Sequence, residues 1–304
     1  MHRLRPEIAP AAAFRNQYQK VVPVCWAVSY SSSVMTMTRI AGSKSFLRGL
    51  WGVRFRTASV AVIVSAVVIV VARMLFAADT PKTAADYDAN PAAMVEAYRH
   101  VEAASVSDAI EQVLHQKSYM SHHMQPIFPT KFAGVALTVK LIKQENHDPD
   151  ALTGMLKAID SGGTGAVYVM QVEGGADIAG MGGLMGTAMF ARGFSGAVID
   201  GGVRDLPQLK RIGFPVYATG SVPSTSVGHY RFGGVNIPVD CGGVRVNAND
   251  IVVADQDGVV VVPREHAAEI LVRAEQLDNS EHSMYPFIEK FRSITEAVKQ
   301  FGRI

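Results

Sequence analysis

A regular alternation of strand-like and helix-like segments is the feature that most constrains the fold of this chain. Four strand patterns occur at residues 131–142, 165–172, 196–200 and 214–220. Helical patterns lie between them at residues 148–163, 182–193 and 205–213. Strands that alternate with helices usually form a sheet covered by those helices. Further strand patterns at 235–246 and 250–263 follow without a helix, and a helical pattern at 265–277 comes next. The order predicts an α/β class, with a layered domain built on a mixed central sheet.

Changes in composition along the 304 residues suggest the domain boundaries. Residues 1–56 are basic and polar, and we expect them to be disordered, whereas residues 57–78 contain an apolar run. Residues 79–98, which begin DTPKTAADYDANP, are interpreted as a polar linker. The α/β domain is assigned to residues 99–280, with a helix at 105–116 that begins with a Ser-x-x-Asp capping pattern, and a helical C-terminal tail to residues 281–304.

The apolar run at residues 58–72, ASVAVIVSAVVIVVA, predicts export of the domain. It is short for a membrane span, which needs about 20 residues, but it suits the core of a signal peptide. The alternative is an uncleaved signal anchor, in which the span continues past Arg73. In both interpretations the N-terminal segment meets the membrane and its basic flank stays in the cytoplasm. The domain is therefore expected to be periplasmic, secreted, or anchored on the outer side of a membrane.

Charge and cysteine content exclude two kinds of site. Residues 1–56 contain nine Lys and Arg against one acid, whereas the portion after residue 78 contains 19 basic and 26 acidic residues. The net charge of +2 therefore gives no support for nucleic-acid binding by the folded part. Cys25 and Cys241 lie on opposite sides of the apolar run, so neither a disulfide framework nor a thiolate metal site is expected.

The first candidate site is the glycine-rich stretch GGADIAGMGGLMG, residues 174–186, between a strand and a helix. Glycines let backbone N–H groups approach an anion at a helix N-terminus. A site for a small carboxylate or phosphate is favoured, and a plain tight loop is the alternative. A loosened dinucleotide-binding fingerprint, with Asp200 twenty residues after Gly180, is a third interpretation. The distance of Gly180 from the preceding strand argues against it.

The second candidate is the pair Arg204–Asp205, which follows the strand ending in Asp-Gly-Gly. In the simpler interpretation Asp205 caps the next helix and Arg204 is solvated. In the functional one, the Arg204 guanidinium binds a carboxylate and Asp205 holds a hard cation largely through water. Loops after successive strands meet at one edge of a sheet, so we expect this pair to lie beside the glycine-rich stretch.

Other motifs are better explained by structure. Adjacent His122 and His123 point in different directions on a helix or strand, which disfavours a two-histidine metal site. Asp148 and Asp150 are typical of a turn and a cap, and the ADQDG segment, residues 254–258, is typical of a hairpin. The chain contains no Gly-x-Ser-x-Gly motif that would indicate a nucleophilic hydrolase.

The order of these motifs resembles the RraA-like family, which contains the ribonuclease regulator RraA and the class II 4-hydroxy-4-methyl-2-oxoglutarate aldolases. The matching segments include SVSDAI, FAGVALTV, FPVYATG, NIPVDCGGVRVNANDIVVADQDGVVVVP and the most specific one, GGLMGTAMFARGFSGAVIDGGVRDL. The resemblance covers roughly residues 100–275. It implies a swivelling-domain-like α/β fold, a homotrimer with sites between subunits, and metal-dependent cleavage of 2-oxo acids to pyruvate, with decarboxylation of oxaloacetate.

Carried over by position, the resemblance implies that Gly182, Gly183, Leu184 and Met185 bind the 2-oxo acid through their backbone. It implies that Arg204 binds substrate and that Asp205 holds the metal ion, Mg²⁺ or Mn²⁺. Two positions depart from the aldolase pattern, since Gly183 and Gln208 stand where acids are often found, and a further acid from a neighbouring subunit could correspond to Glu281.

These observations lead to a metal-dependent lyase as the first hypothesis, in which the metal stabilises the pyruvate enolate and a metal-bound water transfers the proton. A non-enzymatic, protein-binding regulator is the alternative from another class. A dinucleotide-binding protein is the third.

Overall fold

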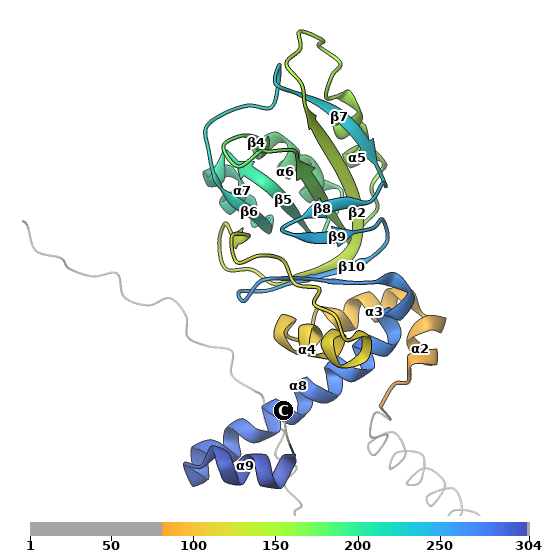
Figure 1. The fold of residues 1–304 in the computed structure, drawn as a ribbon, viewed down its shortest axis with the longest axis vertical. Coiled ribbons are helices and arrows are strands. Elements are labelled where there is room, and N and C mark those ends of the chain that lie inside the picture. The colour runs from red at the N-terminus through yellow and green to blue at the C-terminus, as the bar shows by residue number, and fades with distance from the viewer. Residues whose placement is uncertain (1–80, 303–304) are drawn as a thin grey trace, which may run out of the picture. The chain divides into compact units, whose positions relative to one another are not determined.

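A computed structural model of the chain describes residues 81–302 and confirms the predicted α/β class with a mixed sheet (Figure 1). Four parallel strands form its centre and lie in the order β6, β5, β3, β2. They are β2 (Phe132–Lys143), β3 (Ala166–Val172), β5 (Gly196–Val203) and β6 (Val216–Ser221). The helices that connect them are α5 (Thr153–Ser161), α6 (Gly183–Ala191) and α7 (Leu206–Ile212).

The edges of the sheet are antiparallel. On one side β1 (Gln125–Pro126) pairs with β6. On the other, β10 (Ile251–Ala254) and β7 (Tyr230–Val235) pair with the two halves of β2, and β11 (Val259–Val262) follows β10. A short strand, β4 (Ala179–Met181), lies parallel to the end of β5. The hairpin β8 (Val239–Cys241) and β9 (Val244–Val246) forms a separate two-stranded sheet.

The strand residues alternate between two cores, as the pleat of a strand requires. In β5, Ala197 and Ile199 pack in the core that contains residues of α5, α6 and α7. Val198, between them, packs in the opposite core with Val239 and Val246 of the β8–β9 hairpin. The central strands are therefore buried on both faces, which explains their continuous apolar runs.

A third core lies where the β10–β11 hairpin meets the N- and C-terminal helices (Figure 1). Ile251 and Val260 of that hairpin pack with Ile110 of α4 (Ala103–Leu114) and with Ile270 of α8 (Ala267–Phe291). A short 3-10 helix, η1 (Arg264–His266), leads into α8, and α9 (Ile294–Phe301) follows it. The predicted tail boundary at residue 280 falls inside α8, because this helix continues to Phe291.

The predicted linker at residues 79–98 is wrong for most of its length. Two helices, α2 (Ala84–Ala89) and α3 (Pro91–Tyr98), occupy it and begin at side-chain caps from Thr83 and Asn90. Tyr87, Met94 and Tyr98 are buried in the third core, and the Tyr98 hydroxyl donates to the carbonyl of Ala267. These three buried residues lie on two short helices, in a segment whose remaining residues are mostly small or polar.

The predicted signal peptide or anchor at residues 57–78 lies outside the described residues, as does the basic region 1–56. Within residues 81–302, every helix is too short or too polar to cross a membrane.

Candidate functional site

The two predicted site segments lie side by side at the carboxyl end of the parallel strands. Arg204 and Asp205 follow β5 directly, and Gly182 follows β4, which pairs with the last residues of β5. The backbone N–H of Arg204 donates to the carbonyl of Met181 at 3.1 Å. The glycine-rich stretch contains strand β4, which the sequence did not predict, and this strand holds the two segments together.

The Asp205 side chain joins the two segments. Asp205 adopts a left-handed backbone conformation, with φ 61°, at the start of α7. Asp205 is the N-cap residue of α7, as the simpler interpretation predicts, but its side chain makes no capping hydrogen bond to that helix. Instead, Oδ2 accepts a hydrogen bond from the Gly183 N–H at 2.9 Å. Asp205 thus places a carboxylate at the N-terminus of α6, where the helix dipole stabilises negative charge.

The Arg204 guanidinium lies beside that carboxylate. Its Nε is 3.8 Å from Asp205 Oδ2, and Nη1 donates to the carbonyl of Ser224 at 3.0 Å. Both side chains are about half exposed, which leaves the guanidinium accessible to a ligand in solution. The bond to Ser224 fixes the direction of the arginine side chain without neutralising its charge.

Two hollows flank this pair. The first has a volume of about 320 Å³, and Gly182, Leu184, Met185, Arg204 and Asp205 contribute to its lining. The second, of about 490 Å³, is formed by the residues 203–207 and 221–223. The structure therefore brings the predicted residues together around one hollow, except for Gly183, which is buried and whose N–H is already bonded to Asp205.

Two glycines let the start of α6 pack closely on the start of α7. A Cβ at residue 182 would lie 2.8 Å from Asp205 Oδ2. A Cβ at residue 183 would lie 3.0 Å from both Asp205 Cβ and Gln208 Cγ. Gly183 therefore leaves room for Asp205 and Gln208, and an acidic side chain at this position would displace one of them.

A chain of side-chain hydrogen bonds supports the same turn. Gln208 Nε2 donates to Thr187 Oγ1 at 2.9 Å, and that hydroxyl donates to the carbonyl of Gly183 at 2.7 Å. Arg211 donates to Gln208 Oε1 through two nitrogens. Gln208 thus links α7 to α6 through hydrogen bonds. The glutamine that stands where aldolases often have an acid therefore has a structural role.

The other candidate residues lie elsewhere or have structural partners. Asp200 accepts a hydrogen bond from the Gly242 N–H at 3.0 Å, which argues against a role in binding a ribose. The rings of His122 and His123 lie 4.2 Å apart in a turn and do not diverge as expected. Glu281 lies on α8, where Oε1 accepts the Tyr285 hydroxyl, and neither hollow includes it. Burial raises the pKa of the Cys241 thiol well above its usual range.

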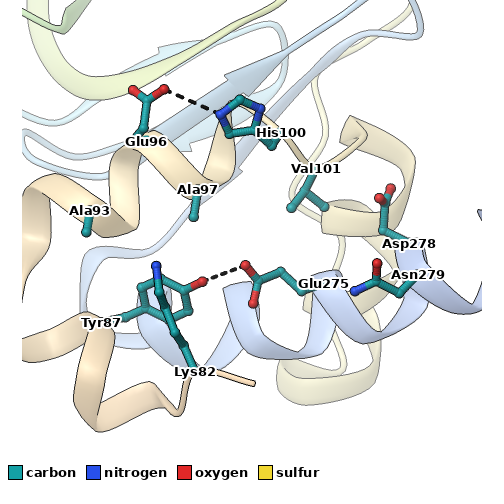
Figure 2. Close-up of a pocket in the computed structure, with 10 residues that line it drawn as sticks. All are labelled: Lys82, Tyr87, Ala93, Glu96, Ala97, His100, Val101, Glu275, Asp278 and Asn279. Carbon is teal, nitrogen blue, oxygen red and sulfur yellow. Dashed lines mark hydrogen bonds and ion pairs between the residues drawn. The ribbon is translucent and has the colours of Figure 1, made fainter. Parts of the chain in front are cut away.

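Figure 2 shows a separate hollow of about 400 Å³ between α2, α3 and α8. Its carboxylates have partners: Glu275 accepts the Tyr87 hydroxyl at 2.5 Å, and Glu96 lies 3.4 Å from His100. In residues 81–302, no group of three or more His, Cys, Asp and Glu side chains is arranged to hold a metal ion. This hollow is therefore interpreted as a gap between packed helices.

The sequence did not reveal one wall of the first hollow. This wall is formed by two segments: Leu152, Met155 and Leu156, in and just before α5, and residues 225–227 of the loop after β6. The loop is held in place by Ser224, whose hydroxyl accepts the Ala179 N–H and donates to the carbonyl of Asp177.

Comparison with known proteins now identifies the family. The RraA-like model, described as Aldolase/RraA, matches residues 103–261, which is about half of the chain. The chain belongs to the RraA-like family. Its matched segment contains both the first turn of α6 and the Arg204–Asp205 pair.

The chain is also similar to individual relatives and solved structures. A protein of Halalkalibacterium halodurans, provisionally named a 4-hydroxy-4-methyl-2-oxoglutarate aldolase, is 27% identical over 59% of this chain and 80% of its own. An uncharacterized protein of Pseudomonas syringae has a similar crystal structure, with a TM-score of 0.62, 26% identity, and coverage of 68% of this chain and 93% of that one. The crystal structure of Streptomyces coelicolor RraAS2, described as an unusual member of the RNase ES inhibitor RraA family, matches with a TM-score of 0.57, 26% identity, and coverage of 66% and 96%.

Proposed function

We propose that this RraA-like protein is a divalent-metal-dependent lyase that cleaves small 2-oxo acids to pyruvate. The observation that supports it most is that Arg204, Asp205 and the first turn of α6 line one hollow. The description of the family as Aldolase/RraA and the name of the Halalkalibacterium relative point to the same reaction class.

The chain can bind the anionic end of such a substrate without rearrangement. The first α-helical hydrogen bond of α6 runs from the Gly186 N–H to the Gly182 carbonyl, so the amides of Leu184 and Met185 precede it. Such amides need partners from outside their helix and favour an anion. We assign the carboxylate of the substrate to the Arg204 guanidinium and the oxygen that gains charge to these amides.

The donor set fits Mg²⁺ or Mn²⁺ better than Zn²⁺. Mg²⁺ is commonly bound by one or two carboxylates, with water and substrate oxygens completing its shell, whereas a zinc site needs at least three protein ligands. Asp205 would hold the ion through Oδ1, since the Gly183 bond and the contact with Arg204 both involve Oδ2. A divalent ion bound there would supply a Lewis acid for an enolate.

Retro-aldol cleavage and β-decarboxylation both produce the pyruvate enolate, so one site can support both. Arg204 would hold the 2-oxo acid in one orientation, and the hydrogen bond from Gly183 would keep Asp205 in place during turnover. The lining of the two hollows offers Arg204 and Asp205 as its titratable side chains. We therefore assign the proton transfer that completes the reaction to a solvent water molecule in the hollow.

A coupled pyruvate assay tests the proposal. Oxaloacetate and 4-hydroxy-4-methyl-2-oxoglutarate are offered to the full chain with Mg²⁺ or Mn²⁺, and then with a chelator. Asp205→Asn and Arg204→Gln should each lower kcat/KM at least 100-fold. The exposed pair Arg245 and Asp240, 3.1 Å apart, provides matched controls, and Asp240→Asn and Arg245→Gln should leave activity unchanged. Wild-type activity in Asp205→Asn would contradict the assignment.

We also propose that the domain is exported and that it assembles as a homotrimer. The apolar run at residues 58–72 and its basic flank support export. A reporter enzyme that is active only outside the cytoplasm, fused after Ile304, should be active, and deletion of residues 57–78 should abolish its activity. The mass of the purified polypeptide would distinguish a cleaved signal peptide from an uncleaved anchor. The mass of the assembled particle in solution would test the trimer.

A protein-binding regulator is the second candidate, because the Streptomyces coelicolor neighbour belongs to a family named for inhibition of an RNase. In that case the chain would form a stable complex with a protein partner, with no pyruvate release. Arg204→Gln and Asp205→Asn would leave the complex intact.

A further inference from the structure

We infer that the substrate of this site is a 2-oxo acid whose remainder is uncharged and apolar, in preference to a di- or tricarboxylate. The inference rests on the proposed function and narrows its substrate class. It follows from the charges and the walls of the two hollows beside Arg204 and Asp205.

The charge of the lining matches a single carboxylate. Among the described residues that line the two hollows, Arg204 is the only cation and Asp205 the only anion. Arg204 is assigned to the carboxylate next to the 2-oxo group. A second carboxylate farther along the substrate would have no cation of this chain to meet, and it would lose part of its hydration on entry.

Besides the charged pair and the polar residues Thr153, Thr225 and Ser226, the first hollow has an apolar wall. Leu152, Met155 and Leu156 form it on the α5 side, with Leu184 and Met185 of α6 and Val227 of the loop after β6. Three of these side chains are unusually exposed for apolar residues: Leu184 is 90% exposed, Val227 68% and Leu156 49%. A hydrocarbon group on the substrate would remove their surface from water, whereas a carboxylate would not.

The α6 turn makes this arrangement specific. Leu184 follows the two glycines that pack against Asp205 and lines the hollow, and its backbone amide precedes the first hydrogen bond of the helix. The same turn therefore binds one end of the substrate by charge and the other by apolar contact. An apolar pocket distinguishes substrates that differ by a single methylene by roughly 10- to 200-fold.

A pair of substrates of nearly equal size separates the alternatives. In 4-hydroxy-4-methyl-2-oxopentanoate, a methyl group replaces the second carboxylate of 4-hydroxy-4-methyl-2-oxoglutarate. In both, the hydroxyl proton leaves to water, the C3–C4 bond breaks and its electron pair forms the enolate. Protonation at C3 then gives pyruvate, with acetone from the methyl compound and a second pyruvate from the other. No oxidant or reductant is needed.

The experiment measures kcat/KM for both compounds with the full chain and Mg²⁺, using lactate dehydrogenase to detect pyruvate. The rate of pyruvate formation is halved for the dicarboxylate to give the turnover rate, because each turnover yields two pyruvates. We expect the methyl compound to be preferred by about 10-fold or more. A preference for the dicarboxylate, including one created by a cation from a second subunit, would overturn the inference while the lyase function stands. Absence of turnover with both compounds and with oxaloacetate would instead contradict the proposed function.

A charge-gain variant provides the second arm. Leu184→Lys places a cation in the wall at a side chain that is 90% exposed, so the fold should tolerate it. It should raise kcat/KM for the dicarboxylate and lower it for the methyl compound, which reverses the preference. Phe190→Lys, on the same helix, half exposed and outside both hollows, is the matched control and should leave the preference unchanged. An unchanged preference in Leu184→Lys would show that this wall does not contact the substrate.

Discussion

Replacement of Gly183 by alanine tests whether the close packing of α6 on α7 shapes the site. The added methyl group would lie 3.0 Å from Asp205 Cβ and from Gln208 Cγ, and 3.2 Å from Gln208 Cβ. Carbon atoms pack best at about 3.5–4.0 Å, so the overlap is roughly 0.5–1 Å. Asp205 cannot easily retreat, because its left-handed backbone and its bond to Gly183 fix it.

The magnitude follows from these contacts. Overpacking of this kind costs about 1–3 kcal/mol, and the lower entropy of the unfolded chain with alanine offsets about 0.4–1 kcal/mol. We therefore expect Gly183→Ala to lower the free energy of unfolding by about 1–2 kcal/mol, which corresponds to a Tm lower by roughly 2–8 °C. A displacement of Asp205 by about half an ångström should lower kcat/KM about 10-fold, since 1 Å can cost 100-fold.

Thermal unfolding and the pyruvate assay measure the two effects. Gly163→Ala is the matched control, because a Cβ at residue 163 meets no atom within 4 Å. In Gly183→Ala/Gln208→Ala, part of the overlap disappears, so some of the stability lost through the methyl group should return. If Gly183→Ala has the stability and activity of the wild type, the argument from close packing is wrong.

Three further predictions concern buried groups away from the site. The hydroxyl of Tyr168 is buried without a hydrogen-bond partner, so Tyr168→Phe should keep or raise the Tm. Tyr98→Phe loses a hydrogen bond to the buried Ala267 carbonyl and should lower the free energy of unfolding by about 1 kcal/mol. Equal effects of the two substitutions would contradict this. Asp255 accepts the N–H of Ala103 at 2.7 Å, so Asp255→Ala should lower the free energy of unfolding by about 1–3 kcal/mol in denaturant titration. Burial raises the pKa of Asp250 above 3.8, so the folded state holds this proton more tightly than the unfolded state. The stability that protonated Asp250 contributes is therefore fully present below pH 3.8 and is lost as the pH rises through the pKa of the folded state. Asp250→Asn should flatten that part of the curve of unfolding free energy against pH. An unchanged slope would refute this prediction.

The sequence predicts the parallel centre of the fold well because burial on both faces leaves a strong pattern. The segments that became β2, β3, β5 and β6 are largely apolar and contain β-branched residues, and the helices between them end near glycine. Residues 84–98 were missed because only Tyr87, Met94 and Tyr98 are fully buried in them, and the partners of these side chains lie on α8 and in the β10–β11 region, far along the chain. Pattern reasoning cannot detect a face that distant segments complete.

The candidate site shows the same limit. Proximity of the glycine-rich stretch and Arg204–Asp205 could be predicted, because both follow strands at one edge of a sheet. The bond from the Gly183 N–H to Asp205 could not, since it depends on strand β4 and on the left-handed conformation of Asp205. The apolar wall could not be predicted either, because α5 and the loop after β6 reach it through tertiary packing.

Binding of Mn²⁺ in the presence of oxalate, an analogue of the pyruvate enolate, tests the central claim most directly. Electron paramagnetic resonance of free Mn²⁺ would be followed during titration of the wild type, Asp205→Ala, Arg204→Gln and the surface control Asp240→Asn. We predict that oxalate and Mn²⁺ bind together at one site per chain in the wild type and in Asp240→Asn. Binding should be lost in Asp205→Ala and weakened at least 10-fold in Arg204→Gln. Undiminished binding in Asp205→Ala would contradict the claim that this carboxylate and the first turn of α6 form one metal and anion site.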